Sequence, residues 1–373
     1  MMKKLLTILP ALLAAVLVFC AALYLDAFHG VNTVEPQPRE PKVWETEPAQ
    51  TTEATEAPEQ AQPTETEPVE TEPQMERFLL TFVGDCTLGC RDGHSYIELG
   101  FTKTIGEDYG YPFRNVIDYF SGDDFTMINL EGAFCDKGNP VQKAHTFRGP
   151  TAYVNILTEN SVEAVSLANN HSLDYGQKGY DSTVAALEGA GIPYVERDSA
   201  ALVTTDSGLT VGIYGAVYYR FDEEDMAAEI AALKEKADVV VFAPHWGIEE
   251  TYAPTKEQTR LAHAAIDAGA DIVYGSHPHV LQPIEEYNGG IIYYSLGNFS
   301  FGGNIYPDDY DTALIQQEVT READGTISLG QRVIIPACIS SDPDKNNYQP
   351  TPYETGSEDY NRVLEKLAGT WKK

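Results

Sequence analysis

Short apolar runs alternate with amphipathic stretches along much of the chain. Five apolar runs have the length and composition of buried strands: 77–83, 125–130, 162–167, 239–243 and 271–274. Several of them are separated by stretches in which apolar residues recur at helical spacing: 151–159, 178–190, 223–236 and 255–268. Buried strands separated by helices predict an α/β layered domain in which much of the sheet is parallel.

The apolar runs that follow have no helical pattern between them, and we expect them to be antiparallel strands: 291–295, 312–320 and 331–335. No second linker interrupts the chain after residue 77. The pattern therefore predicts one large domain, 77–340, with two sheets flanked by helices, followed by a C-terminal extension, 341–373.

Polar residues that can bind metals stand at the ends of the five predicted strands. They are Asp85, Glu131, Asn170 with His171, His245, and His277 with His279. Because the carboxyl ends of parallel strands line the ligand crevice of α/β sheets, these side chains are expected to lie close together. A mixture of carboxylate, amide and imidazole suits Mn, Fe or Zn better than calcium. One carboxylate between two cations, with histidines on both sides, would give the two-metal arrangement that activates water.

Each of these residues also has an ordinary structural explanation. An Asp after a strand is often a turn or a helix cap, Asn-Asn is common in turns, and a buried His is usually hydrogen-bonded in the core. Five strand ends with the same feature are harder to explain in this way. The pattern as a whole therefore favours a metal site, although no single residue in it does.

The first residues differ from the domain in composition. Lys3 and Lys4 precede an uncharged apolar run of 21 residues, 5–25, which is long enough to cross a bilayer as a helix. A cleaved signal peptide and a lipid-modified Cys20 are the alternatives, and the length of the run favours an uncleaved anchor. All three place the domain outside the cytoplasm, because the positive flank stays inside. We expect a single-pass anchor in the cell membrane at 1–28, with the domain extracellular.

The next segment, 29–76, is expected to be a disordered linker. Residues 35–76 contain 12 Glu, 8 Pro and 7 Thr, so almost nothing there can be buried. The whole chain has 57 acidic and 25 basic residues, a formal net charge of −32, which argues against nucleic-acid binding because that needs clustered Lys and Arg. An anionic ligand would also be repelled, so its binding requires local positive charge from metal ions, Arg91 or Arg148.

Motifs around the strand ends follow one another in a recognisable order. They are Gly84-Asp85, Asn129-Leu130-Glu131-Gly132, Phe147-Arg148-Gly149-Pro150, LANNHSLDYG at 167–176, FAPHWGIE at 242–249, GADIVYGSHPHVLQPIE at 269–285 and YSLGNFSF at 294–301. Together they resemble the CapA family of poly-γ-glutamate capsule biosynthesis proteins, over about residues 78–302. The resemblance implies a calcineurin-like metallophosphatase fold, a four-layer αββα sandwich of two sheets between helices.

The resemblance also implies roles for individual residues. The metal positions would be Asp85, Glu131, Asn170, His245, His277 and His279, which would bind one or two divalent transition-metal ions, Mn, Fe or Zn. His171 corresponds to the histidine that protonates a leaving group or stabilises the transition state in metallophosphatases.

Two departures from the wider superfamily concern the metal positions. Its first motif is normally Asp-x-His, whereas Asp85 is followed by Cys86 and Thr87, so one imidazole is missing. Its second motif normally has Asp where this chain has Glu131. One metal position is therefore expected to be weak or empty.

Two further residues are candidates for the reaction. Arg148 could grip a carboxylate or phosphate through its planar guanidinium, or it could form a surface ion pair. Asp174, three residues after His171, could orient that imidazole by accepting a hydrogen bond, or it could cap the following helix.

The domain contains Cys86, Cys90, Cys135 and Cys338. Cys90 follows Asp85 by five residues and Cys135 follows Glu131 by four, so the two would lie at similar distances from a shared metal site. We hypothesise a Cys90–Cys135 disulfide in the exported domain.

Two functions agree with these observations. The first is a surface-tethered CapA-like component of poly-γ-glutamate capsule synthesis or export. Its partners would be poly-γ-glutamate or another anionic polymer, and membrane-embedded capsule synthesis and export proteins. It could be a metal-dependent hydrolase or transferase, or it could bind and guide the polymer without turnover. The alternative is an extracellular metal-dependent phosphoesterase that acts on nucleotides or phosphosugars.

Overall fold

The structure, a computed structural model, describes residues 40–45, 75–91, 93, 99–217 and 222–372. They belong to one unit, Glu40–Lys373. The expected anchor, 1–28, and most of the expected linker, 29–76, lie outside the described residues. Among the residues that are described, no helix is both long and apolar enough to cross a bilayer.

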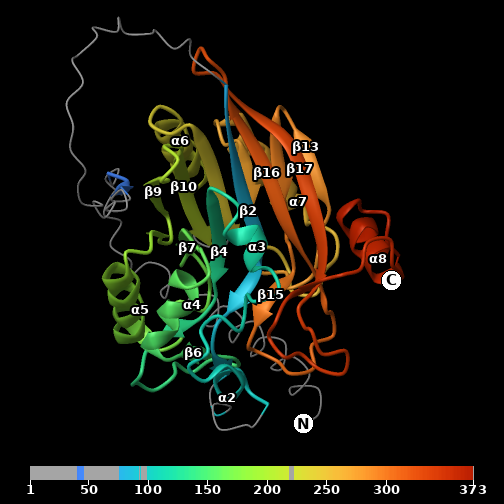
Figure 1. The fold of residues 1–373 in the computed structure, drawn as a ribbon. Coiled ribbons are helices and arrows are strands. Elements are labelled where there is room, and N and C mark those ends of the chain that lie inside the picture. The colour runs from blue at the N-terminus through green and yellow to red at the C-terminus, as the bar shows by residue number, and fades with distance from the viewer. Residues whose placement is uncertain (1–39, 46–74, 92, 94–98, 218–221, 373) are drawn as a thin grey trace, which may run out of the picture. The chain divides into compact units, whose positions relative to one another are not determined.

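The first sheet is built around the first strand of the domain (Figure 1). Its strand order is β18-β17-β16-β2-β4-β7-β8, and β15 also pairs with β2. The strands are β2 (Glu76–Thr87), β4 (Phe125–Leu130), β7 (Ala164–Ser166), β8 (Tyr194–Val195), β15 (Asn298–Phe301), β16 (Asp311–Arg321), β17 (Ile327–Cys338) and β18 (Thr351–Pro352). The neighbouring strands β2, β4, β7 and β8 run parallel to one another. Strand β16 is antiparallel to both of its neighbours, β2 and β17, as the sequence predicts.

The second sheet has the strand order β1-β9-β10-β11-β12-β14-β13. Its strands are β1 (Lys42–Glu45), β9 (Ser199–Thr204), β10 (Thr210–Val217), β11 (Val239–His245), β12 (Ile272–Tyr274), β13 (Ile284–Tyr287) and β14 (Gly290–Tyr293). The four strands β10, β11, β12 and β14 are parallel. A small third sheet has the order β3-β6-β5, formed by β3 (Cys90–Arg91), β6 (Phe147–Gly149) and β5 (Ala133–Phe134).

All the described helices except the last one cover the outer faces of the two large sheets (Figure 1). The helices are α2 (Phe101–Ile105), α3 (Ile117–Phe120), the 3₁₀ turn η1 (Thr151–Tyr153), α4 (Val154–Thr158), α5 (Gly176–Ala190), α6 (Glu223–Lys234), α7 (Lys256–Asp267) and α8 (Glu358–Leu367). The predicted helix at 151–159 is thus a 3₁₀ turn that continues into α4. The other three predicted helices correspond to α5, α6 and α7.

The two large sheets pack against each other through one shared apolar core. On β11, Val241 joins this core together with Met127 of β4. The preceding residue, Val240, points to the outer face of the second sheet, because successive residues of a strand point to opposite faces. There it packs with Ile230 of α6 and Leu261 of α7. Helices α4 and α5 pack on the outer side of the first sheet. The α/β prediction is confirmed, and the layer order is helix, sheet, sheet, helix.

The expectation of antiparallel pairing at 291–295 was wrong in part. Strand β14 pairs parallel with β12 and antiparallel with β13, a strand that the apolar pattern did not reveal. Asn288 and Gly289 join β13 to β14 with φ values of 46° and 86°. Positive φ at both residues of a two-residue connection is the geometry of a type I′ hairpin turn, which an Asn-Gly pair favours. The Asn-Gly dipeptide was therefore the signal for the missing strand.

Part of the expected linker is ordered as strand β1, at the edge of the second sheet and parallel to β9. Trp44 packs against the core, with its ring centroid 5.5 Å from that of Tyr194. Lys42 Nζ donates a hydrogen bond to Glu188 Oε1 at 2.8 Å. The Lys-Val-Trp triplet interrupts the Glu/Pro/Thr composition, and its Trp44 side chain explains why this stretch can pack on the domain.

The hypothesised Cys90–Cys135 disulfide is wrong, because both cysteines are free. Cys90 lies in β3, and Cys135 directly follows β5, which is on the other side of β6. Neighbouring strands are about 4.8 Å apart, so two strands that flank a third are separated by about 10 Å. A disulfide requires Cα atoms within about 7 Å of each other. Cys90 Sγ instead contacts Thr102 Oγ1 at 3.1 Å.

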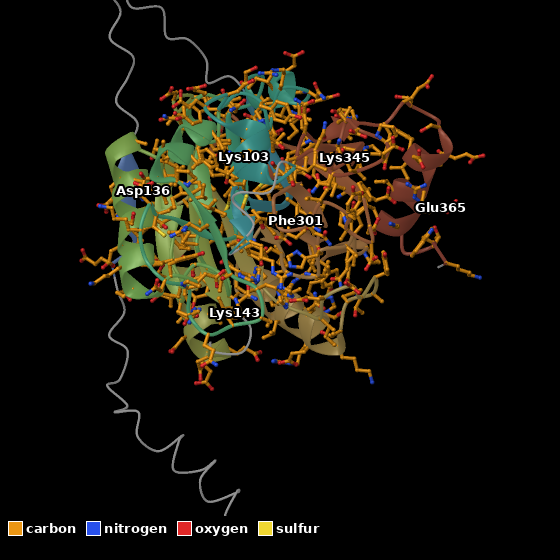
Figure 2. All side chains as sticks on the ribbon, turned by 90° about the horizontal axis from the view of Figure 1, so that it is seen from below. Lys103, Asp136, Lys143, Phe301, Lys345 and Glu365 are labelled. Carbon is orange, nitrogen blue, oxygen red and sulfur yellow. The ribbon has the colours of Figure 1, made fainter. Side chains whose placement is uncertain are left out.

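The C-terminal extension packs on the same unit as the sheets. β18 pairs with β17, and α8 places Val363 and Leu367 in the core between the sheets. The side chain of Lys366 is only 3% exposed, and its ammonium donates to Asp309 Oδ2 at 2.7 Å and lies 2.8 Å from Asp311 Oδ2. The neighbouring Glu365 and the more distant Lys345 lie at the surface in Figure 2.

Replacing Lys366 by alanine is expected to lower the free energy of unfolding by about 3 kcal/mol, because two buried carboxylates lose their shared cation. The matched control is Lys345→Ala, since Lys345 is one-third exposed and forms a longer ion pair with Asp342, at 3.4 Å. The control should change stability by less than about 0.5 kcal/mol. Urea unfolding followed by circular dichroism measures both variants. Equal losses would contradict a structural role for Lys366.

The same ion pairs predict a pH dependence of stability. Burial alone would raise the pKa of Asp311, but hydrogen bonds from Arg362 and the charge of Lys366 outweigh it and hold that pKa below its usual range. The stabilising contribution is therefore complete above the unfolded pKa of about 3.9, and it is lost as pH falls through the lower folded value. Unfolding experiments between pH 6 and pH 2 should show this loss. The loss should be smaller in Lys366→Ala.

Candidate metal centre

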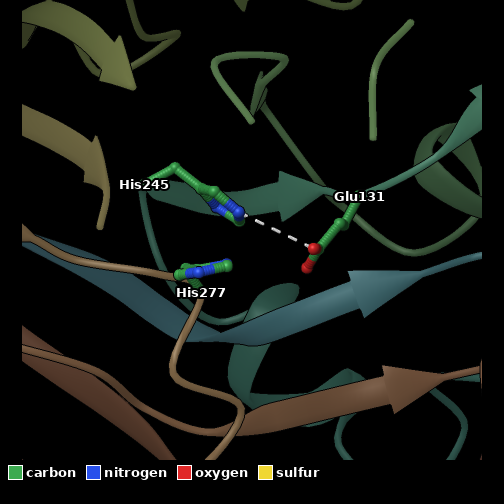
Figure 3. A group of neighbouring side chains, drawn as sticks. All are labelled: Glu131, His245 and His277. Atoms are coloured by element: carbon green, nitrogen blue, oxygen red, sulfur yellow. Dashed lines mark ion pairs between the residues drawn. The ribbon is translucent and has the colours of Figure 1, made fainter. Parts of the chain in front are cut away.

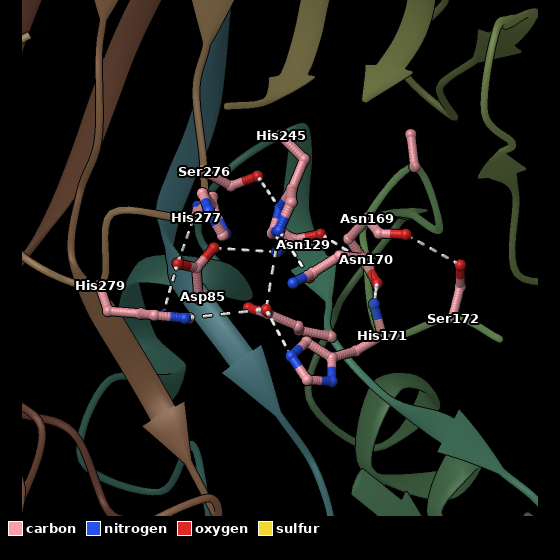
Figure 4. A network of polar contacts seen from close by, with 12 residues as sticks. Asp85, Asn129, Asn169, Asn170, His171, Ser172, His245, Ser276, His277 and His279 are labelled. Carbon is pink, nitrogen blue, oxygen red and sulfur yellow. Dashed lines mark hydrogen bonds and ion pairs between the residues drawn. The ribbon is translucent and has the colours of Figure 1, made fainter. Parts of the chain in front are cut away.

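All six predicted metal positions and His171 lie together at the carboxyl ends of strands from both large sheets (Figure 4). From the first sheet, Asp85 lies in β2, Glu131 follows β4, and Asn170 and His171 follow β7. From the second sheet, His245 is the last residue of β11, and His277 and His279 follow β12. The two sheets thus contribute opposite halves of one cluster.

Glu131 lies in the middle of this cluster. It is completely buried, and neither carboxylate oxygen has a hydrogen-bond partner among the described residues. Its Oε1 lies 3.7 Å from His171 Nε2, 3.7 Å from His245 Nε2 and 3.8 Å from His279 Nε2. These distances are too long for hydrogen bonds. They are close to the roughly 3.0–3.5 Å that separates two ligands of one transition-metal ion with bonds of about 2.1 Å.

The imidazoles are held so that their Nε2 atoms face Glu131. His279 Nδ1 donates to Asn298 Oδ1 at 3.0 Å and lies 3.2 Å from Asp85 Oδ2. His245 Nδ1 forms a hydrogen bond with Ser276 Oγ at 2.9 Å. When an ion is bound, a proton held on Nδ1 would leave the Nε2 lone pair for the metal, the form in which histidine is a ligand.

Burial favours the neutral form of three imidazoles of the cluster, those of His171, His245 and His277, whereas His279 is an exception. Burial lowers the pKa of His171 and His245, and it lowers the pKa of His277 to about 4. Burial also raises the pKa of Glu131, which disfavours its charged form. At His279 burial would lower the pKa, but the carboxylates of Glu131 and Asp85 outweigh it and raise the pKa to about 10. A divalent cation fits this donor set, because it would add positive charge beside two buried carboxylates and take the lone pairs of the neutral imidazoles.

Three groups of side chains have ligand atoms within 4.8 Å of one another: Glu131, His245 and His277; Asp85, Glu131 and His279; and Glu249, His277 and His279. Two of them share Glu131, as expected for a carboxylate between two ions. Figure 3 shows Glu131 pointing toward His245 and His277. The predicted ligand Asn170 is also in place, with Oδ1 at 2.9 Å from His245 Nε2.

The backbone of the two histidines that follow β12 is strained. His277 has a φ of 98° and His279 a φ of 58°, values that residues with a Cβ rarely adopt. Each such conformation costs on the order of 1–3 kcal/mol and persists where the surrounding structure enforces it, often at functional sites. The strain is consistent with selection for the positions of these two imidazoles.

Of the two predicted reaction residues, Asp174 reaches the cluster. Its Oδ2 lies 2.7 Å from His171 Nδ1 and also accepts a hydrogen bond from the Phe147 backbone at 2.7 Å. The structure therefore favours an orienting contact with His171. The alternative, a cap for the following helix, is not observed, because no side chain caps the N-terminus of α5.

Arg148 does not reach the cluster. Phe147, its neighbour in β6, has its ring 4.6 Å from that of His171, so Arg148 points to the opposite face of the strand. Its guanidinium lies over the Tyr175 ring at 4.6 Å and donates to Gly138 O at 3.3 Å. The predicted role in gripping an anion is not supported by this placement.

Sequence reasoning missed several residues that support the cluster. Asn129 Nδ2 donates to Asp85 Oδ1 at 2.9 Å, and Asn169 Nδ2 donates to Asn129 Oδ1 at 3.0 Å. Both asparagines lie within two residues of a predicted ligand, so the strand-end pattern contained the signal. Lys143 Nζ donates to Asp174 Oδ1 at 3.2 Å and to Asn170 O at 2.8 Å. Lys143 lies outside every motif and had no signal in the sequence.

A pocket of about 670 Å³ opens beside the cluster. His171 and His279 line it on the side of the cluster, and Arg91, His145 and Glu249 also contribute to its walls. The pocket is therefore large enough for a substrate segment next to the candidate metal ligands.

The chain is thus an α/β protein with a candidate metal-binding site. In this site a buried carboxylate lies among histidines at the strand ends of two facing sheets. Residues 79–303 match the family model described as "Bacterial capsule synthesis protein PGA_cap", and the chain belongs to this family.

Curated relatives agree with this family. The "PGA biosynthesis protein CapA" of Bacillus subtilis (strain 168) is 31% identical over 273 residues, which are 67% of this chain and 70% of that protein. The "Capsule biosynthesis protein CapA" of Bacillus anthracis is 31% identical over 324 residues, 78% of this chain and 73% of that protein. The resemblance to the CapA family is thus confirmed.

A solved structure of NAD nucleotidase (NadN) from Haemophilus influenzae is a more distant neighbour. It has a TM-score of 0.39 and 11% identity, and the match covers 79% of this chain and 63% of that chain. A similarity of this size carries no inference about fold or activity.

Glu131→Gln is expected to abolish tight binding of Mn²⁺ while stabilising the metal-free chain by about 1–2 kcal/mol. The reason is that glutamine removes the charge of a buried carboxylate that has no hydrogen-bond partner among the described residues. Metal content after dialysis and thermal unfolding in a chelator measure the two effects. Arg148→Ala is the control and should bind Mn²⁺ like the wild type. If the metal-free Glu131→Gln variant is less stable than the metal-free wild type, the Glu131 carboxylate must have a stabilising partner, and the prediction is wrong.

Proposed function

We propose that this chain is a surface-tethered component of poly-γ-glutamate capsule synthesis or export that acts on the polymer at a metallophosphatase-type centre of one or two divalent ions. The observation that carries the proposal is Glu131, a buried carboxylate without a hydrogen-bond partner among the described residues, which faces three imidazoles beside a pocket of about 670 Å³. The names of the two Bacillus relatives support the pathway. The apolar run at 5–25 supports a single-pass membrane anchor with the domain outside the cell.

The residues of the chain suit hydrolysis of a bond in the polymer. Bound divalent ions would act as Lewis acids that activate water and polarise the scissile group. His171, oriented by Asp174 at 2.7 Å, presents Nε2 toward the cluster and can hold the proton that the leaving atom needs. Lys143 fixes Asp174 from the other side, at 3.2 Å. The Phe147 ring covers one face of the imidazole and limits access of water there.

The pocket suits an anionic polymer only in part. Arg91 and His145 provide positive or polar groups on its wall, whereas Glu249, Glu250 and Asp308 are acidic. We infer that a carboxylate-rich chain would be held chiefly at the metal centre, with Arg91 as a second contact. Membrane-embedded proteins of capsule synthesis or export would be the partners that deliver the polymer.

His171→Asn in the Mn²⁺-loaded full-length chain is expected to lower the rate of poly-γ-glutamate cleavage by about 10²–10⁴-fold, because the proton donor is lost. Binding of the polymer should change by less than about twofold, since the ligands for metal remain. Gel filtration of the polymer after incubation and isothermal titration calorimetry measure the two quantities.

A panel of aryl phosphate esters and nucleotides tests the alternative function in the same preparation. Rapid turnover of these esters that is lost in His171→Asn, together with an unchanged polymer length, would favour an extracellular phosphoesterase. Polymer binding without cleavage of either substrate would reject the hydrolytic step and retain a guiding role.

A further inference from the structure

Glu249 lies in the loop that follows β11, four residues after His245. One of its carboxylate oxygens lies within 4.8 Å of a nitrogen of His277 and of a nitrogen of His279. Glu249 is exposed and lines the pocket, whereas Asp85 and Glu131 are buried and do not. The two histidines therefore have carboxylates on two sides: buried ones within the cluster and an exposed one at the pocket.

The loop that carries Glu249 is fixed to the segment that carries the two histidines. Trp246 N donates to Ser276 O at 3.0 Å, and Glu250 N donates to Pro278 O at 2.9 Å. Gly247 makes the turn with a φ of 88°, and a Cβ there would lie 2.8 Å from the Gln258 side chain. These contacts hold the backbone on both sides of Glu249 next to His277, so the fold places the start of its side chain within reach of the two histidines.

Several buried polar groups of the candidate metal centre and of β2 have no hydrogen-bond partner in the described part of the chain. The Nδ1 atom of His277 is buried and has no hydrogen-bond partner among the described residues, and the same holds for both oxygens of Glu131. On β2, Thr87 is two residues after Asp85, and its hydroxyl is also buried without a partner in the described part of the chain. A threonine therefore stands where an Asp-x-His motif would supply an imidazole, and the donor set is one ligand short.

We propose that Glu249 is a metal ligand that enters from the pocket side and, with His277 and His279, supplies the donor that the sequence Asp85-Cys86-Thr87 lacks. This inference rests on the proposed metal centre. A carboxylate oxygen is an ordinary ligand of Mn²⁺, Fe²⁺ and Zn²⁺. Because Glu249 borders the pocket, it also places this ligand where a substrate oxygen would approach the ion.

The chain offers a matched control in the next residue. Glu250 is also exposed, also lines the pocket and carries the same charge, but it belongs to none of the three groups of candidate ligands. Glu249→Gln and Glu250→Gln thus remove the same negative charge from the same loop. Any loss of affinity through long-range electrostatics alone should be similar in the two variants.

Isothermal titration calorimetry of the metal-free full-length chain with Mn²⁺ measures the affinity of each class of site. In Glu249→Gln the affinity of one class should be at least about 10-fold lower than in the wild type. Glu250→Gln should remain within about twofold of the wild type. The visible absorption spectrum of the Co²⁺-loaded chain should change in Glu249→Gln only, because the spectrum reports the ligands of the ion. Circular dichroism checks that both variants are folded.

Equal shifts in the two variants, or an unchanged Co²⁺ spectrum in Glu249→Gln, would reject Glu249 as a ligand and leave the metal centre intact. A wild-type chain that binds none of Mn²⁺, Fe²⁺ and Zn²⁺ would reject the metal centre itself. The two failures are therefore distinguishable in one series of measurements.

Discussion

The arrangement of the site depends on one constraint, the burial of the Glu131 carboxylate without a hydrogen-bond donor among the described residues. An isolated buried carboxylate costs several kcal/mol, so its charged form requires a nearby cation. A proton on His279, whose pKa the surrounding carboxylates raise to about 10, meets part of this requirement. The other imidazoles contribute lone pairs, because burial lowers the pKa of His245 and His171. A cation-binding role explains why so polar a cluster is retained in the interior.

The strand ends were predictable because parallel strands direct their carboxyl ends to the same edge. That rule alone predicts that Asp85, Glu131 and His245 lie in one cluster. The direction of a side chain on a two- or three-residue strand was not predictable. Arg148 is adjacent to Phe147 and points away from the site, because the register of β6 gives the inner face to Phe147. The similar spacing of Cys90 from Asp85 and of Cys135 from Glu131 also led to a wrong disulfide prediction, since β6 lies between the strands of the two cysteines.

The structure shows how the negative charge of the chain bears on the binding of an anionic substrate. The formal charge of −32 opposes the approach of any polyanion, and three of the acidic residues that contribute to it line the pocket: Glu249, Glu250 and Asp308. Lys143, which the sequence did not reveal, is committed to Asp174 and to the Asn170 carbonyl. Arg91 is thus the candidate from the sequence that lies at the pocket, and Arg148 is not. Under the proposed function, the metal centre must supply most of the attraction for an anionic substrate.

The geometry of the cluster also depends on the packing between the two sheets. Glu131 lies four residues after Met127 of β4, and His245 lies four residues after Val241 of β11. Met127 and Val241 both belong to the core between the sheets. The 3.7 Å separation of Glu131 Oε1 and His245 Nε2 is therefore set by how closely this core brings the sheets together. Protein interiors are close-packed and transmit small displacements, so a change of volume at Met127 or Val241 would alter the distance between ligands that come from different sheets. Ligands that share a loop, such as His277 and His279, would move together. The site thus couples metal affinity to a core that it does not touch.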